Sequence, residues 1–382
     1  MPFALEALEA KHGDALLLHY GSATAPQLIV IDGGPAGVYT RTLKPRLDQL
    51  KQERSPDKPL PIRMVMVSHL DDDHLNGILQ LIGKLAGLKE QDKPLPYEIT
   101  TLWHNSFDDL LGNEADELVA SLRTAVTAAS AASFPASLPV RRDTALVLAS
   151  VQQGRQLRDA ASRLGLGVND GFRNLVMVPA GKKSRVFDAG GGLKLTVIGP
   201  DEERVRALQQ EWDEQILQAG VARAADLADN SAFNLSSLTV LAKFRKKSML
   251  LTGDARGDYV LAGLRRAQLL KNGKLHVDLL KIPHHGSDNN VDTSFFRVVT
   301  ADHYVVSGNG GDGNPEVATF QMISEARGQD EFTIHLTHGT LPKDPRPTKL
   351  LDFFQREKEA GKKYTTAVRP EGSLGITVDL LA

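Results

Sequence analysis

The chain has 382 residues, no cysteine and a formal net charge of −2, with 41% hydrophobic and 24% charged residues. These values are ordinary for a globular protein with a sizeable core, and they exclude disulfides, a thiolate metal site and a cysteine nucleophile. The near-neutral charge argues against a generally basic nucleic-acid binder, although a local basic groove is compatible with it. Any bound metal would be held by histidine, carboxylate, backbone or water.

The first hundred residues alternate strand-like and helix-like segments. Apolar or β-branched runs bounded by Gly, Asp and Pro predict strands over residues 3–10, 15–20, 28–32, 64–68 and 97–103. Apolar residues at helical spacing predict helices over 39–52 and 75–89. The prolines between residues 54 and 61 predict a loop.

Beyond residue 108 the composition changes, because Ala, Leu, Gln and Arg dominate up to residue 165. We expect two or three helices here, as an insertion at about 106–170 that is either a cover over one sheet face or a lid that selects substrate. Further strands are predicted at 175–179, 194–198, 238–244, 248–252, 276–282, 303–307, 332–336 and 375–380. Further helices are predicted at 201–220, 258–270, 316–327 and 349–361.

The segment His69-Leu70-Asp71-Asp72-Asp73-His74 places two histidines and three aspartates in six residues, directly after the apolar run 64–67. A buried strand should end here and a helix begin, and the carboxyl end of a strand is where open α/β sheets bind ligands. Neutral imidazoles and carboxylates are ligands for a divalent cation, and without a cation the carboxylates would repel one another. The pattern therefore indicates a metal site.

This hexapeptide resembles the HxHxDH signature of the metallo-β-lactamase fold superfamily, in the variant HxDxDH. That variant is similar to the hydrolase domain of the competence DNA-uptake protein ComEC and its stand-alone relatives. Further segments resemble other elements of the family in the expected order, at 12–18, 28–34 ("IDGG"), 234–240, 250–254 ("LLTGD") and 278–287 ("LKxPHHGS"). The chain departs from the family at Asn314-Pro315, where a His-Pro is expected. The resemblance implies one domain over 1–382 of the α/β class, an αββα sandwich of two mixed sheets packed face to face with helices outside.

The resemblance also implies a binuclear site for two divalent metal ions, Zn²⁺ or Mn²⁺. The implied metal ligands are His69, Asp71, Asp73, His74, Asp254 and His284. His69 and Asp71 would bind the first metal and the others the second, with Asp254 bridging. Asp73 would also orient the attacking water, and so is the predicted catalytic residue.

Several other positions are candidates for supporting roles. His285 either replaces His284 as the ligand or contacts substrate, and Lys281 either faces an anionic substrate or forms an ion pair. The third ligand of the first metal is open. Its candidates, for each of which a packing or surface role is the alternative, are His104, Asp229, Asn230, Ser236, Ser237, His335 and His338.

Asp71 stands where the superfamily's signature has its second histidine. A carboxylate oxygen is a harder ligand than imidazole, so the site should be less selective for zinc. We expect Mn²⁺ to support activity at least as well as Zn²⁺.

These features predict a metal-dependent hydrolase, a phosphodiesterase or nuclease that uses a metal-activated water on an anionic phosphodiester, including nucleic acid. The alternatives are a lactone, thioester or β-lactam hydrolase, whose sites usually keep the second histidine, and a non-catalytic regulatory module. No GxxxxGK[ST] or GxGxxG motif follows a strand, so nucleotide binding by those loops is not expected. No signal peptide or run of ~18 apolar residues is found, which predicts a cytoplasmic protein without membrane contact. Protein partners are left open.

Overall fold

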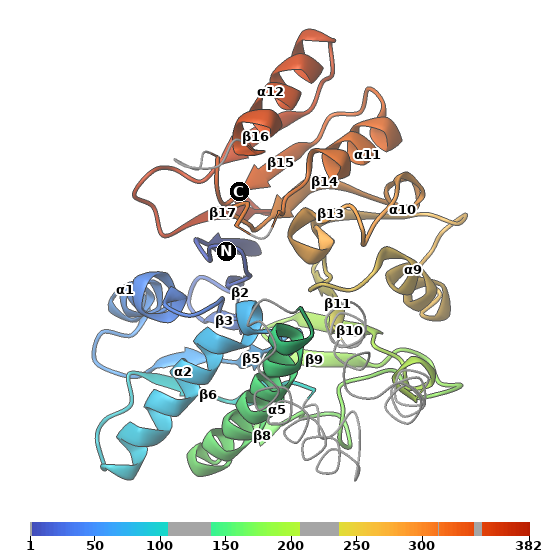
Figure 1. Ribbon diagram of the computed structural model, residues 1–382. Helices are drawn as coiled ribbons and strands as arrows, with labels where there is room; N and C mark the ends of the chain where they lie inside the picture. The colour runs from blue at the N-terminus through green and yellow to red at the C-terminus, as the bar shows by residue number, and fades with distance from the viewer. Residues whose placement is uncertain (1, 106–138, 207–236, 312, 340–345) are drawn as a thin grey trace.

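The computed structural model describes residues 2–105, 139–206, 237–311, 313–339 and 346–382 (Figure 1). Within these ranges most strands belong to two large mixed sheets, one of seven strands and one of eight. A separate two-stranded sheet pairs β4 (Leu60–Ile62) with β6 (Tyr97–Ile99).

The first sheet is antiparallel on one side and parallel on the other. Its strand order is β17 (Gly375–Asp379), β1 (Ala4–Leu8), β2 (Leu16–Gly21), β3 (Pro26–Ile31), β5 (Met64–Met66), β7 (Thr101–Trp103) and β8 (Gly167–Val168). Pairing is antiparallel from β17 to β3 and parallel from β3 to β8.

The second sheet repeats this division. Its strand order is β16 (Thr365–Val368), β15 (Thr333–Leu336), β14 (Val299–Val306), β13 (Leu275–Lys281), β12 (Lys247–Leu251), β11 (Thr239–Phe244), β10 (Leu193–Gly199) and β9 (Val186–Gly190). Pairing is parallel from β16 to β12 and antiparallel from β12 to β9.

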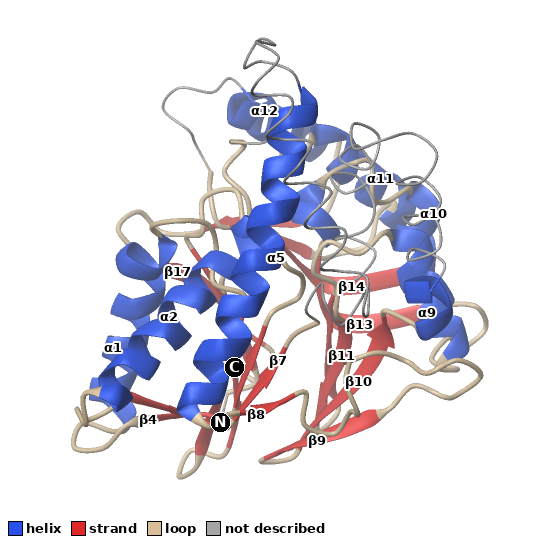
Figure 2. Cartoon of the chain, turned by 60° about the horizontal axis from the view of Figure 1, so that its bottom comes forward, coloured by secondary structure: helices blue, strands red, loops and turns tan. Residues whose placement is uncertain are grey.

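Helices cover the outer faces of both sheets, and the sheets pack on each other through a third apolar core (Figure 2). The helices on the first sheet are α1 (Lys44–Arg54), preceded by the π-helical turn Tyr39–Leu43, α2 (Asp72–Glu90) and α5 (Pro139–Leu164). Those on the second are α9 (Gly257–Arg266), α10 (Thr293–Val298), α11 (Val317–Arg327) and α12 (Arg346–Glu359). The predicted α/β class with an αββα sandwich is confirmed.

Three local predictions differ from the structure. The helix after the metal motif begins at Asp72, three residues earlier than predicted, so the last half of the motif forms its first turn. The predicted strand 97–103 is two strands, β6 and β7, in different sheets. The predicted strand 175–179 is wrong, because the side-chain amide of Asn105 satisfies both backbone groups of Val176. Only an isolated bridge from Val178 to Asp201 forms there.

Two predicted helical regions lie partly outside the described residues. Of the insertion at 106–170, residues 106–138 are not described, and α5 packs along α2. Of the helix predicted at 201–220, only 202–206 is described as helical. Strands β4, β8, β9 and β16 and helix α10 were not predicted, since their short sequences lack a clear apolar period. Across the described ranges, no helix has both the length and the hydropathy needed to cross a bilayer.

The parallel halves of the two sheets bring their carboxyl ends to one edge. Residues that follow β3, β5, β12, β13 and β14 meet there across the gap between the sheets. The antiparallel strands β2 and β11 begin at the same edge, so the loops before them also reach it. This edge is where such folds place ligand-binding side chains.

Candidate metal centre

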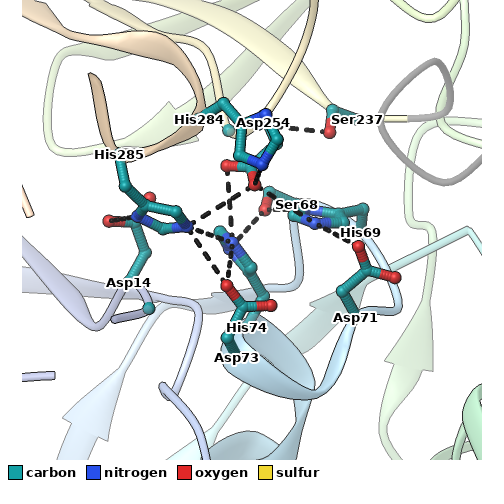
Figure 3. A network of polar contacts seen from close by, with 12 residues as sticks. Asp14, Ser68, His69, Asp71, Asp73, His74, Ser237, Asp254, His284 and His285 are labelled. Carbon is teal, nitrogen blue, oxygen red and sulfur yellow. Dashed lines mark hydrogen bonds and ion pairs between the residues drawn. The ribbon is translucent and has the colours of Figure 1, made fainter. Parts of the chain in front are cut away.

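Four imidazoles surround the buried carboxylate of Asp254, which follows β12 (Figure 3). His74 Nε2 lies 3.4 Å from Asp254 Oδ1. His69 Nε2 and His284 Nε2 each lie 3.7 Å from Oδ2, and His285 Nε2 lies 3.5 Å from it. Two of the histidines follow β5 of the first sheet and two follow β13 of the second, and each directs its Nε2 at the Asp254 carboxylate.

The other nitrogen of each ring is held by an oxygen. The Nδ1 partners are Ser68 Oγ for His69 (3.0 Å), Asp32 Oδ2 for His74 (2.9 Å), Asn290 Oδ1 for His284 (2.7 Å) and the Ser307 carbonyl for His285 (3.1 Å). An Nδ1–H that donates to such an oxygen leaves the Nε2 lone pair free, and this is how proteins orient histidines that ligate metals. All four rings are therefore set to offer Nε2 to the centre.

The carboxylates divide the centre into two neighbouring groups. In the first, Asp71 Oδ2 lies 3.3 Å from His69 Nε2. In the second, Asp73 Oδ2 lies 3.2 Å from His285 Nε2 and 3.6 Å from His74 Nε2, and these two ring nitrogens are 3.1 Å apart. Asp254 lies between the groups, as Figure 3 shows. In two sets all ligand atoms lie within 4.8 Å of one another, namely Asp14, His74, Asp254 and His285, and His69, Asp73 and His74.

The donor set fits a divalent cation. His69 Nε2 and Asp254 Oδ1 are buried and have no hydrogen-bond partner in the part of the chain that the structure describes. Burial opposes ionisation of Asp254, yet the charges of His285 and His74 beside it hold its pKa well below the ordinary value. Burial likewise opposes protonation of His74, but Asp254 and Asp73 raise its pKa well above the ordinary value. The carboxylates thus require positive charge at this point, which a cation would supply in place of protons.

Close backbone approaches fix the start of α2 against the neighbouring loops. Gly33 N–H donates to the carbonyl of His74 (2.7 Å), and Gly77 N–H donates to that of Gly34 (3.0 Å). A Cβ on Gly77 would lie 2.0 Å from the Gly33 oxygen. Only glycine allows this approach, which sets the position of the first turn of α2 and its ligands.

His284 and His285 occupy a tight turn, Pro283–Gly286, after β13. Their φ angles are 46° and 51°, in the left-handed region that non-glycine residues rarely adopt. Such residues cost about 1–3 kcal/mol each and cluster at functional sites. The turn directs two successive rings toward the same carboxylate, which an extended backbone could not do because it alternates its side chains.

The structure brings together the predicted ligands of the motif and Asp254, but it separates the two histidines of the turn. His285 is buried against Asp73 and His74, whereas the His284 side chain is 29% exposed and approaches only Asp254 among the carboxylates of the described residues. The resemblance favoured His284 as the ligand beside Asp73 and His74, and in the structure it is His285 that lies against these two residues.

Lys281 and Ser237 have supporting positions. Lys281 is 1% exposed and its Nζ lies 2.7 Å from Asp14 Oδ2, so it is a buried ion-paired residue that does not face solvent. Burial would raise the pKa of Asp14, but Lys281 and then His285 hold it below the ordinary value. Ser237 Oγ accepts a hydrogen bond from the Asp254 N–H (3.3 Å).

The described members of the remaining candidates have contacts with other parts of the chain. The backbone of His104, after β7, is bonded on both sides to the Asn169 side chain (2.9 and 2.8 Å). His335 pairs with His303 at 3.1 Å, and His338 lies 3.1 Å from Glu9. The other candidates, Asp229, Asn230 and Ser236, lie outside the described residues.

Sequence reasoning missed the residues that orient the rings. These are Asp14, Asp32, Ser68, Asn290 and Ser307. Asp32 lies in the "IDGG" turn, and Asp14 follows a Gly just before β2, so both lay within segments that carried the resemblance. Their position at strand ends facing the motif was the available signal.

Comparison with known proteins gives only distant structural similarity. No protein-family profile matches the chain, and no curated protein matches it. Among solved structures, CmlA, a diiron β-hydroxylase from Streptomyces venezuelae, is 10% identical with a TM-score of 0.40, covering 100% of this chain and 55% of CmlA. A protein from Parabacteroides distasonis assigned as a metal-dependent hydrolase is 9% identical with a TM-score of 0.31, covering 94% of this chain and 96% of that one. The chain thus spans about half the length of CmlA, and similarity this low says nothing about activity.

Proposed function

We propose that the protein is a metal-dependent hydrolase of the metallo-β-lactamase fold with a binuclear site. The observation that carries the proposal is that four histidines, each held at Nδ1 by an oxygen, direct Nε2 at one buried carboxylate. A polar cluster that only stabilised the fold would not need four imidazoles that all leave Nε2 free. A metal site needs this arrangement, because Nε2 is the atom that ligates the ion.

The two groups suggest how the ligands would be shared. His69, Asp71 and Asp254 would hold the first cation, and His284, which pairs with Asp254 but not with Asp73, would be its further ligand. The second cation would be held by the residues closest to His285, namely Asp73, His74 and Asp254. In this proposal both histidines of the turn are ligands, one for each cation, and Asp254 would bridge the two cations.

The chemistry follows from this arrangement. Two bound divalent cations lower the pKa of water and stabilise the negative charge that develops on an attacked group. Asp73, at 23% side-chain exposure, is a more accessible carboxylate than Asp254 at 3%. Asp73 can therefore orient an incoming water, whereas Asp254 is enclosed and acts as a ligand only.

The proposed substrate is a phosphodiester, including those of nucleic acids. The HxDxDH motif supports this, because Asp71 stands where lactone and β-lactam hydrolases usually keep a histidine. The carboxylate oxygens of Asp71, Asp73 and Asp254 also suit a harder cation such as Mn²⁺, and such a cation binds phosphoryl oxygens well. Mn²⁺ is expected to serve at least as well as Zn²⁺.

The test is hydrolysis of bis-p-nitrophenyl phosphate by metal-stripped protein that is re-supplied with Mn²⁺ or Zn²⁺. Bound metal is counted on the same samples. Asp73→Asn removes a proposed ligand, and Asp72→Asn is the matched control, because Asp72 instead accepts hydrogen bonds from Asn76 (2.9 Å) and Gln153 (3.3 Å).

We expect about two metals per chain and metal-dependent turnover that Asp73→Asn lowers by at least about 100-fold and Asp72→Asn by less than about fivefold. Protein that binds two metals yet leaves this ester, single-stranded DNA and RNA intact would contradict the phosphodiesterase. Activity with Zn²⁺ alone would contradict the metal preference.

A further inference from the structure

A second feature lies beside the metal centre, at the carboxyl edge of the second sheet. A shallow hollow with an inner volume of about 20 Å³ lies between the end of β10, the start of β11 and the start of α9. Ser237 and Ala255 line it. The Ser237 hydroxyl accepts a hydrogen bond from the Asp254 N–H, and Ala255 follows Asp254 in the chain. The hollow is therefore next to the metal centre.

The hollow contains an aromatic ring with a guanidinium stacked on it. Arg204 Cζ lies 3.6 Å from the centre of the Tyr259 ring, and both residues line the hollow. Among the described residues, no carboxylate forms an ion pair with Arg204. The nearby carboxylate of Asp201 is bonded to Arg266 (2.9 Å) and to the Arg204 backbone N–H (2.9 Å). Within the part of the chain that the structure describes, the Arg204 guanidinium is thus stacked on Tyr259 without an ion-pair partner.

A neighbouring arginine shows the contrast. Arg256 Cζ lies 5.0 Å from the same Tyr259 ring, but its guanidinium makes two bonds to the Asp258 carboxylate, at 3.2 and 3.0 Å. Its charge is already matched. Of these two arginines at one ring, only Arg204 lines the hollow.

We propose that Arg204, held in place by Tyr259, binds a second phosphate group of the substrate, next to the phosphodiester that is cleaved. A planar guanidinium binds phosphate through two parallel hydrogen bonds, and stacking fixes the plane of its donors before the ligand arrives. The substrate class is then a nucleotide chain or another ester with neighbouring phosphates. This inference rests on the proposed function for the identity of the cleaved bond.

The test compares three thymidine dinucleotides: one without a terminal phosphate, one with a 5′-phosphate and one with a 3′-phosphate. Binding of phosphorothioate-linked forms, which resist cleavage, is measured by calorimetry on Mn²⁺-loaded protein, and KM and kcat are measured on the ordinary forms. The variants are Arg204→Gln, Arg204→Lys as a conservative rescue, and Arg256→Gln as the matched control, each checked for an unchanged melting temperature.

We expect one terminal phosphate to tighten binding by about tenfold or more, as for one charge-assisted contact. Arg204→Gln should abolish that gain through KM while leaving the unphosphorylated dinucleotide within about twofold. Arg204→Lys should restore part of the gain, and Arg256→Gln should keep all of it. Equal binding of the three dinucleotides, or a gain that survives Arg204→Gln, would overturn the subsite. Binding is measured without cleavage, so absent turnover with a phosphate-dependent affinity gain would count against the hydrolase and still support the subsite.

Discussion

Replacing Lys281 by methionine tests how the buried charge next to the metal centre is balanced. Lys281 and Asp14 are each 1% exposed, and 2.7 Å separates Nζ from Oδ2. At an effective dielectric constant of about 20, two unit charges at that distance attract by about 6 kcal/mol. Most of this attraction offsets the cost of taking both groups out of water.

The variant removes one partner and leaves the other charge buried. Breaking a buried pair in this way costs about 3–5 kcal/mol, far more than the net value of the pair, because the remaining carboxylate keeps its desolvation penalty. We expect Lys281→Met to lower the free energy of unfolding by about that amount at pH 7. Lys281→Met combined with Asp14→Asn should lose less than Lys281→Met alone, since the stranded charge is gone.

The assay is urea unfolding followed by far-ultraviolet circular dichroism, on metal-stripped protein. Lys247→Met is the control, because Lys247 pairs with Asp278 at a similar 2.8 Å but with the lysine side chain 37% exposed. That pair should contribute less than about 1 kcal/mol. Equal losses for Lys281→Met and Lys247→Met would refute the reasoning, as would a double variant less stable than Lys281→Met.

Three further predictions follow from other contacts. Asp32→Asn should weaken cation binding by about 10- to 100-fold in calorimetry while the protein stays folded, because His74 loses the carboxylate that orients it; unchanged affinity would contradict this role. Gly77→Ala should destabilise the protein by about 1–3 kcal/mol in the same unfolding assay, because a Cβ would lie 2.0 Å from the Gly33 oxygen; a neutral result would show that α2 can shift. Burial lowers the pKa of His335 to about 4, so its contribution to stability is complete above pH 6.5 and is lost as pH falls from there to about 4, a loss of roughly 3 kcal/mol; unfolding measured across this range should be less pH-dependent in His335→Gln, and an equal slope would contradict the assignment.

The sheets and most helices could be predicted because their apolar residues recur at the period of the element. The strand predicted at 28–32 and the helix predicted at 75–89 are examples, and they correspond to β3 and α2. The error at 175–179 has a specific cause. Leu175, Val176 and Val178 are buried, but the backbone of Val176 is hydrogen-bonded to the Asn105 side chain instead of a neighbouring strand. The spacing of apolar residues cannot reveal a partner that lies so far away in the sequence.

The part of the candidate site whose ligand-type residues lie close together in the sequence could be predicted. The segment from His69 to His74 carries five ligand-type side chains in six residues, and Asp254 follows a recognisable strand. The choice between His284 and His285 could not be made in this way, because it depends on two left-handed backbone conformations. Asp14 and Asp32 are single aspartates in short turns, and only the folded chain brings them to the ring nitrogens.

The division of the ligands between the two sheets has a consequence for how the protein matures. A ribosome-bound chain that has emerged only through β8 already contains His69, Asp71, Asp73 and His74, but it lacks Asp254 and the histidines of the turn at 283–286. With the proposed ligand set, tight cation binding would require that β12 and β13 have been synthesised and have docked. The bound ions would then link the residues that follow the first sheet's strands to those that follow the second sheet's strands. A protein that retains its ions would therefore be one in which both sheets have assembled.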